Sequence, residues 1–273
     1  MKTHGVFVIM GLAVTLSCEQ LTTPAAEPDD LFDAPLDGLS AHELRAFALG
    51  DEEFGRPFSA VEGLGPLFND VSCAGCHSGD GRGNLGNRLI RFSQGSDLLL
   101  DFGGPQLQDK YLPGAKPERL PPGVQVSVRL PPPVFGAGLI EAIPDSALLA
   151  NVDSLDADGD GISGRPNWVT PPAYLPVTEP GAAPGLQIGR FGRKAQVSSL
   201  LQQVVVAYQQ DMGITSDFIP AENHGPRAAA QTVAADRVVD PELPAPVAQT
   251  VTNYLRMLAP PAAGPIAGSR RVG

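Results

Sequence analysis

The chain has 273 residues, of which 42% are hydrophobic and 18% charged, and this balance excludes an intrinsically disordered protein. Its formal net charge of −11 argues against nucleic-acid binding, because nucleic-acid phosphates are also negative. The 31 glycines and 28 prolines favour short helices joined by many loops, since both residues interrupt regular structure.

The first residues have the features of a bacterial export signal. Lys2 precedes a mostly apolar stretch, 5–16, that is too short to span a bilayer. Cys18 follows as in the lipobox of lipoproteins, although Thr15 stands where leucine is usual. We predict a signal peptide over 1–17, a flexible tether over 18–38, and a periplasmic or cell-envelope protein whose one membrane attachment is a lipid anchor at Cys18. Ordinary cleavage, with Cys18 lost or left free, is the alternative.

The first predicted helix runs from 41 to 49. Ser40 and Glu43 form a capping box before it, and Gly50 is expected to end it.

Cys73, Cys76 and His77 form a C-x-x-C-H motif, the strongest local signal in the chain. The two thiols can each add to a vinyl group of one haem, and the histidine can ligate its iron. The alternatives are a redox dithiol or half of a zinc site. A redox dithiol does not require the histidine, and a zinc site needs two further ligands although the only other cysteine is Cys18. The motif therefore predicts one covalently bound haem c.

Side chains around this motif have two possible roles. Phe54, Phe58, Leu64 and Phe68 either wall the porphyrin or are ordinary core residues. Arg82 lies in a glycine-rich loop, where it can pair with a haem propionate or remain solvated.

The next part of the chain predicts limited β-structure. Alternating apolar residues over 87–104 favour a small hairpin, and Val124, Val126 and Val128 suggest one strand in a proline-rich region.

Two acidic features follow. Glu141 stands among apolar residues, where a carboxylate could act as a catalytic acid–base group, although an ordinary surface glutamate is the more common case. Asp156, Asp158 and Asp160 form a D-x-D-x-D-G pattern that predicts a Ca²⁺ loop. Asn167 replaces the usual final glutamate of such a loop, and an acidic solvated turn is the alternative.

Two longer helices complete the chain, over 194–211 and 243–258, each with apolar residues at helical spacing. Met212, at the end of the first, is a candidate sixth ligand for the haem iron, with His42, His224 and Met257 as rivals. We predict a disordered tail over 263–273.

Several passages together resemble one family. They are 63–69 (GLGPLFN), the C-x-x-C-H motif, 136–145 (GAGLIEAIPD), 158–167 (DGDGISGRPN), 189–195 (GRFGRKA) and 211–216 (DMGITS). They resemble the bacterial exported di-haem c-type oxidoreductases, which include thiol oxidoreductase-like proteins and di-haem peroxidases and are distantly similar to cytochrome c peroxidases.

The resemblance implies a mainly α fold over 39–262, a cytochrome-c-like haem domain with long Pro/Gly-rich loops and at most a small β-hairpin. It also implies a second haem module after the 258–261 passage (LAPP). This sequence contains one C-x-x-C-H motif, so we expect the N-terminal part of such an enzyme, truncated before the second module.

The predicted function is electron transfer by a c-type haem protein, with a redox partner protein in the periplasm. Peroxidase-like catalysis would require a second haem supplied elsewhere. A mono-haem carrier without catalysis and an inactive fragment remain the alternatives.

Overall fold

A computed structural model describes residues 32–79, 81, 83 and 86–261 of the chain. The helices are α1 (Ala41–Gly55), α2 (Cys73–Cys76), α3 (Ala137–Ala142), α4 (Asp145–Leu149), α5 (Leu200–Met212), α6 (Ala230–Val233) and α7 (Ala245–Met257), with one 3-10 turn, η2 (Leu100–Phe102). The strands are β1 (Leu67–Phe68), β2 (Leu89–Ser93), β3 (Gln106–Leu107), β4 (Lys110–Tyr111), β5 (Gln125–Arg129), β6 (Trp168–Val169) and β7 (Gln187–Ile188). The predicted signal peptide, Cys18, Arg82 and the predicted tail lie outside the described residues.

The expected fold class is wrong. Helix accounts for 28% and strand for 13% of the structure, with three small sheets, so the chain is not mainly α and a cytochrome-c-like fold is not shown. In the part of the chain that the structure describes, only α1, α5 and α7 are longer than six residues. The frequent glycines and prolines explain this, because the long segments between these helices are repeatedly broken into turns.

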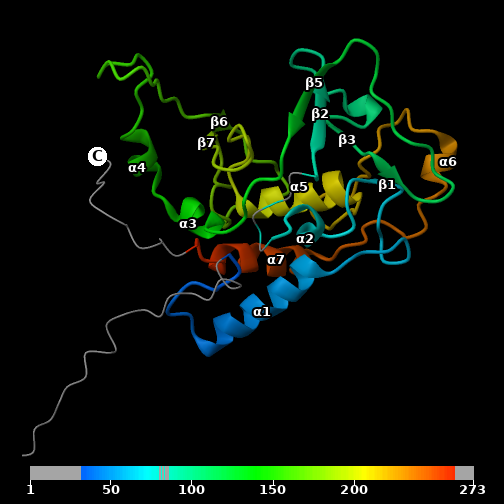
Figure 1. The fold of residues 1–273 in the computed structure, drawn as a ribbon, viewed down its shortest axis with the longest axis horizontal. Helices are drawn as coiled ribbons and strands as arrows, with labels where there is room; N and C mark the ends of the chain where they lie inside the picture. Colours follow the sequence, from blue (N-terminus) through cyan, green and yellow to red (C-terminus); the bar gives the residue numbers. More distant parts are fainter. Residues whose placement is uncertain (1–31, 80, 82, 84–85, 262–273) are drawn as a thin grey trace, which may run out of the picture.

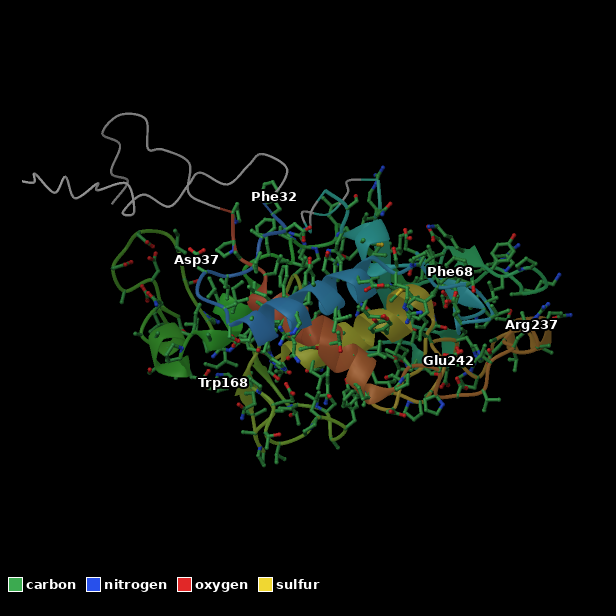
Figure 2. All side chains as sticks on the ribbon, turned by 90° about the horizontal axis from the view of Figure 1, so that it is seen from below. Phe32, Asp37, Phe68, Trp168, Arg237 and Glu242 are labelled. Atoms are coloured by element: carbon green, nitrogen blue, oxygen red, sulfur yellow. The ribbon has the colours of Figure 1, made fainter. Side chains whose placement is uncertain are left out.

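The core lies between the three long helices. α7 packs against both α1 and α5 and lies between them (Figure 1). The view turned by 90° shows the same helices at the centre of the molecule (Figure 2). Phe47 of α1, Tyr208 of α5 and Val251 of α7 belong to one buried cluster. Burial of such apolar side chains is the main favourable term in folding.

The start of α1 confirms the predicted capping box, but its end does not confirm the predicted stop. Ser40 N donates to Glu43 Oε2 at 2.7 Å, and Glu43 N donates to Ser40 Oγ at 3.3 Å. The helix continues past Gly50 to Gly55. A Cβ atom at Gly50 would collide with the Cβ of Tyr254 in α7. Gly50 therefore permits a close crossing of two helices.

α7 begins and ends close to its predicted bounds, 243–258, whereas α5 begins at Leu200 and not at the predicted residue 194. Leu200, Leu201, Val204 and Tyr208 of α5 are buried, as their spacing predicted. Gly213 ends α5 with φ +66°, a left-handed conformation that glycine adopts without strain. Residues 194–199, which the prediction included in the helix, precede it as turns and extended chain.

The small sheets are built from antiparallel pairs. The hairpin predicted over 87–104 is wrong, because β2 lies in that range but pairs with β3 and β5, which both lie outside it. Val126 and Val128 lie in β5, where a strand was predicted. Both valines are exposed, which shows that alternation here did not mark a buried face. β1 pairs with β4, and β6 with β7.

Residues 32–38, assigned to the predicted tether, lie against the end of α7. Leu36 N donates to Met257 O at 2.8 Å, and Ala259 N donates to Ala34 O at 2.9 Å. Within the described ranges, no helix combines the length and apolar character that a membrane crossing requires.

We predict that Gly50→Ala lowers the free energy of unfolding by about 1–3 kcal/mol, although alanine is the better helix former, because the added methyl group cannot fit against Tyr254. Gly55→Ala is the matched control, since a Cβ there meets no atom within 4 Å. It should stay within about 0.5 kcal/mol of wild type. Equal effects of the two substitutions in urea unfolding would contradict the close crossing.

Candidate functional site

The C-x-x-C-H motif forms one helical turn beside the core. α2 follows Ser72, whose Oγ accepts a hydrogen bond from Gly75 N at 3.0 Å. His77 comes next, and its N–H donates to the Cys73 carbonyl at 2.9 Å. Helical residues three positions apart lie on one face, so this turn places both thiols on the same side, next to the imidazole. Neither thiol is in a disulfide.

The imidazole of His77 is held as the neutral base. Burial lowers the pKa of His77 to about 4, although a hydrogen bond to the backbone of Pro132 acts in the opposite direction. The Nδ1 atom is buried and has no well-formed hydrogen bond. Because a metal-ligating histidine must be unprotonated, this ring has the state that an iron ligand requires.

The two thiols are poor candidates for a redox dithiol. Burial raises the pKa of Cys73 and of Cys76 to about 12, and the charge of Asp211 adds to both shifts. Reactive redox cysteines need the opposite shift, because the thiolate is the nucleophile. Among the described residues, the groups of side chains that could hold a metal ion include neither cysteine, so a zinc site also lacks support.

Phe54 is an aromatic neighbour of this turn. The ring centroids of Phe54 and His77 lie 6.1 Å apart. Phe58 meets Tyr208 edge-on at 5.9 Å. The four residues expected either to wall the porphyrin or to form ordinary core are all buried in the main core cluster, against which Cys73 packs: Phe54, Phe58, Leu64 and Phe68. These core residues lie beside the motif, a position that suits both a porphyrin wall and an ordinary core.

The loop before the motif is attached to the C-terminal end of α5. Gly65 N donates to Met212 O at 3.1 Å, and Asn69 N and Asp70 N donate to Asp211 O at 2.7 and 3.1 Å. These bonds satisfy carbonyls that have no partner within the helix. Met212 is 2% exposed and belongs to the same core cluster, so its position at the end of α5 brings it to the side of the core that carries the motif.

A buried polar network next to this loop was not anticipated. Gln106 Nε2 donates to Asn69 Oδ1 at 2.9 Å, to Gln210 O at 3.0 Å and to Asp211 Oδ1 at 2.5 Å. Burial raises the pKa of Asp211 to about 6, while the Gln106 hydrogen bond opposes this shift. The one sequence signal was an acidic residue at the end of a helix that is otherwise mostly apolar.

Glu141 does not stand in apolar surroundings. Its Oε2 pairs with Arg256 Nε at 2.6 Å, and its Oε1 accepts a hydrogen bond from Leu200 N at 2.9 Å. Arg256 also pairs with Glu179 at 2.6 Å. The Glu141 side chain is 6% exposed. Glu141 therefore joins α3 to α7 and to the N-terminal end of α5. A negative carboxylate at that end of α5 also interacts favourably with the helix dipole.

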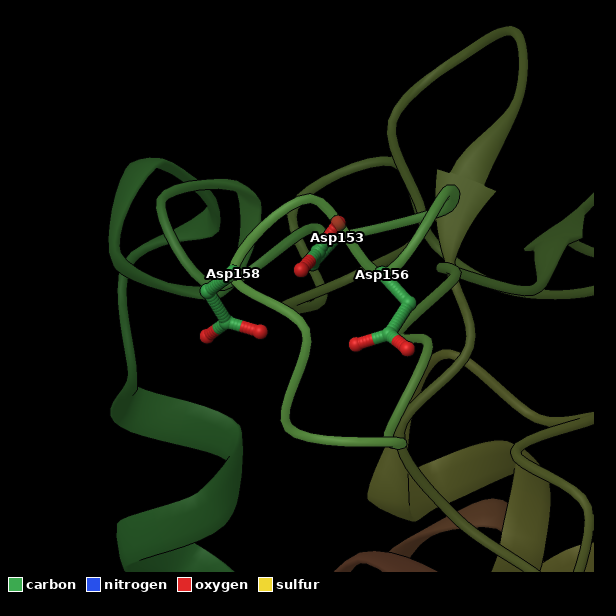
Figure 3. A group of neighbouring side chains, drawn as sticks. All are labelled: Asp153, Asp156 and Asp158. Carbon is green, nitrogen blue, oxygen red and sulfur yellow. The ribbon is translucent and has the colours of Figure 1, made fainter.

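The acidic loop brings together a different set of carboxylates from the predicted one. Asp153, Asp156 and Asp158 offer oxygens that lie within 4.8 Å of one another, and Figure 3 shows them around one turn of the chain. Asp160 is not in this group, and its Oδ1 accepts a hydrogen bond from Ile162 N at 2.7 Å. We call Asp153, Asp156 and Asp158 the acidic loop.

We predict that Glu141→Gln lowers the free energy of unfolding by roughly 1–3 kcal/mol, because a neutral amide leaves Arg256 with a weaker partner. Glu62→Gln is the matched control, since Glu62 pairs with Arg56 at 3.8 Å on the surface. It should change stability by less than about 1 kcal/mol. If Glu141→Gln lowers stability in thermal unfolding no more than Glu62→Gln does, the Glu141–Arg256 pair does not stabilise the fold.

The chain was also compared with known proteins. Residues 115–269 match the family model described as "di-haem oxidoreductase, putative peroxidase". The matched region contains Glu141, the acidic loop and Met212, and it begins after the C-x-x-C-H motif. No curated protein and no solved structure matches the chain. The family match covers more than half of the sequence, and the chain therefore belongs to the di-haem oxidoreductase family.

Proposed function

We propose that this chain is a c-type haem protein that transfers electrons, with the haem attached to Cys73 and Cys76 and its iron ligated by His77. The observation that carries the proposal is the neutral His77 imidazole, whose Nδ1 is buried without a well-formed hydrogen bond, beside the buried Cys76 and the half-buried Cys73 on the same turn. Family membership supports a di-haem oxidoreductase or peroxidase-like role at a coarser level.

The residues present fit a covalently bound haem. An orphaned buried imidazole nitrogen and two free thiols are the donor set that such a group uses. When bound, the haem would supply one-electron redox chemistry. Cys73 and Cys76 would hold it by two thioether bonds, and the Pro132 backbone would orient the His77 ring. Arg82, outside the described residues, remains a candidate partner for a propionate.

A non-catalytic electron carrier is the second candidate. Glu141, the predicted acid–base residue, already binds Arg256 and the first N–H of α5, so proton transfer would have to break these contacts. Met212 is buried on the same core and would serve as the sixth ligand of a carrier. Catalysis by Glu141 is the competing proposal.

Location and partner are proposals from sequence alone. The apolar stretch before Cys18 supports export to the periplasm and a lipid anchor at that residue. The net charge of −11 supports a redox partner with a basic surface, because opposite charges steer protein encounters.

We also propose that the acidic loop binds Ca²⁺. Three carboxylates this close repel one another unless a cation or protons neutralise them. Asp153 and Asp156 accept backbone hydrogen bonds from Ala157 and Gly161, which orders the turn that carries the three side chains.

The haem proposal predicts that the chain, expressed with a c-type maturation system, carries haem that resists denaturing extraction. Cys73→Ala should leave a single thioether and shift the pyridine haemochrome absorption band. Replacing both Cys73 and Cys76 by alanine should abolish covalent haem, because no attachment thiol remains in the motif. The measurement is haem content per chain after denaturation.

Cys18→Ala is the control, since it removes the third thiol and should leave haem attachment unchanged. On the same samples, Met212→Leu should lower the reduction potential if the thioether is the sixth ligand, whereas Met257→Leu should not. Covalent haem in the double-cysteine variant would overturn the proposal. Peroxide reduction that is lost in Glu141→Gln at normal haem content would favour catalysis over the carrier.

The Ca²⁺ proposal predicts that EDTA lowers the melting temperature and that added Ca²⁺ restores it, because a ligand that binds the native state stabilises it by mass action. Asp156→Asn should reduce the rise in melting temperature that Ca²⁺ binding at the acidic loop causes. Asp160→Asn is the matched control, because Asp160 lies in the same loop but outside the group. Identical Ca²⁺ titrations of both variants would refute the assignment.

A further inference from the structure

A second group of carboxylates lies far along the chain from the acidic loop. Glu222 follows α5, and Asp236 and Glu242 lie between α6 and α7. Each offers an oxygen, and these oxygens lie within 4.8 Å of one another. Figure 2 shows Glu242 at the end of the molecule that also carries Phe68 and Arg237. We call Glu222, Asp236 and Glu242 the three-carboxylate cluster.

The cluster contains buried oxygens without partners. Both carboxylate oxygens of Glu222 are buried and accept no well-formed hydrogen bond, and Oε1 of Glu242 is in the same state. The backbone N–H of Asn223 slightly favours the ionised form of Glu222 but lacks hydrogen-bond geometry. Leaving such atoms unpaired is unfavourable, and more so when they are charged. The unpaired oxygens therefore point to a missing positive partner.

One oxygen of the cluster is fixed in place by the protein. Glu242 Oε2 accepts hydrogen bonds from Thr215 N at 2.7 Å and Thr215 Oγ1 at 2.8 Å. Thr215 Oγ1 also lies 2.5 Å from Asp240 Oδ1. These bonds hold Glu242 with its second oxygen free, so the arrangement is ordered before any ligand is bound.

The main electrostatic effects on the cluster come from acidic residues. Burial raises the pKa of Glu222 to about 8, and Asp240, Glu242 and Asp236 raise it further. Burial likewise raises the pKa of Glu242 to about 7, with additional effects of Asp240 and Asp236. The charged residues among the main causes of both shifts are all acidic. Either protons or a cation must neutralise this group near neutral pH.

We propose that the three-carboxylate cluster binds a divalent cation that prefers oxygen ligands, with Ca²⁺ as the best fit. Ca²⁺ binds carboxylate oxygens at 2.3–2.6 Å, so two ligand oxygens can be up to about 5 Å apart. The spacing within 4.8 Å satisfies this limit. Mg²⁺ needs shorter bonds and near-ideal octahedral geometry, which loop residues from three positions supply less readily.

Such an ion would connect the segment after α5 to the segment before α7. The same two segments contact the loop that leads to α2. Asn223 Nδ2 donates to Leu67 O at 3.0 Å, and a Cβ at Gly63 would meet Glu242 Cβ at 2.8 Å. Binding of the ion would therefore also stabilise the chain immediately before the C-x-x-C-H motif.

The test is a calcium titration of the full chain after EDTA treatment, followed by calorimetry and thermal unfolding. The background variant is Asp156→Asn, which removes a ligand from the acidic loop. We expect this background to retain one Ca²⁺ site and a calcium-dependent rise in Tm. Adding Glu222→Gln should weaken the remaining affinity at least tenfold and abolish that rise.

Glu118→Gln in the same background is the matched control. Burial raises the pKa of Glu118 to about 8, and its Oε1 is also buried without a partner, but it lies outside the cluster. It should leave calcium binding unchanged. Asp236→Asn is the second cluster variant and should weaken binding if Glu222→Gln does not fold, as judged by circular dichroism.

Several outcomes would overturn the proposal. They are an Asp156→Asn chain that binds no Ca²⁺ at millimolar concentration, cluster variants that fold and bind with unchanged affinity, and equal losses of binding in the Glu118→Gln control. A stability that responds to pH but not to Ca²⁺ would show that protons neutralise the cluster and would also refute the cation.

Discussion

The attachment of residues 65–70 to the C-terminal end of α5 is the constraint on which the site depends. The last carbonyls of a helix need partners, and in this chain Gly65, Asn69 and Asp70 supply N–H groups to Asp211 and Met212. A Cβ at Gly65 would collide with the backbone of Gly213, so the contact requires glycine. Because the loop is held there, the turn Cys73–His77 that follows must lie beside the core.

Carboxylates are buried in this acidic chain in three different ways. Glu141 is neutralised by Arg256 and by the N-terminal end of α5. Asp211 accepts a hydrogen bond from Gln106 and feels the charge of Arg91, which partly offsets its burial. The Glu222 carboxylate accepts no well-formed hydrogen bond, and the nearby charges that raise its pKa further are acidic. The contrast explains why the three-carboxylate cluster, and not the Glu141 pair, suggests a bound ion.

Local features of the fold could be predicted because they depend on neighbouring residues. The capping box of Ser40 and Glu43 and the buried positions of α5 follow from spacings of three and four residues. The end of α1 could not be predicted, because Gly50 serves a contact with Tyr254, about two hundred residues later. The fold class was wrong for a related reason. The sheets are formed by short strands whose pairing depends on contacts between distant residues, which a local sequence pattern does not predict.

The sequence by itself identified the family, which the family model confirms, and it predicted the haem chemistry. A C-x-x-C-H spacing places two thiols and an imidazole on one turn where the segment is helical, as Cys73–Cys76 is. Only the tertiary structure decided which acidic residues meet. Glu141 pairs with Arg256, and Asp153, not Asp160, joins Asp156 and Asp158. Glu222 lies close to Asp236 and Glu242. The physical reason is that burial and charge act through space, between residues that folding brings together from distant parts of the chain.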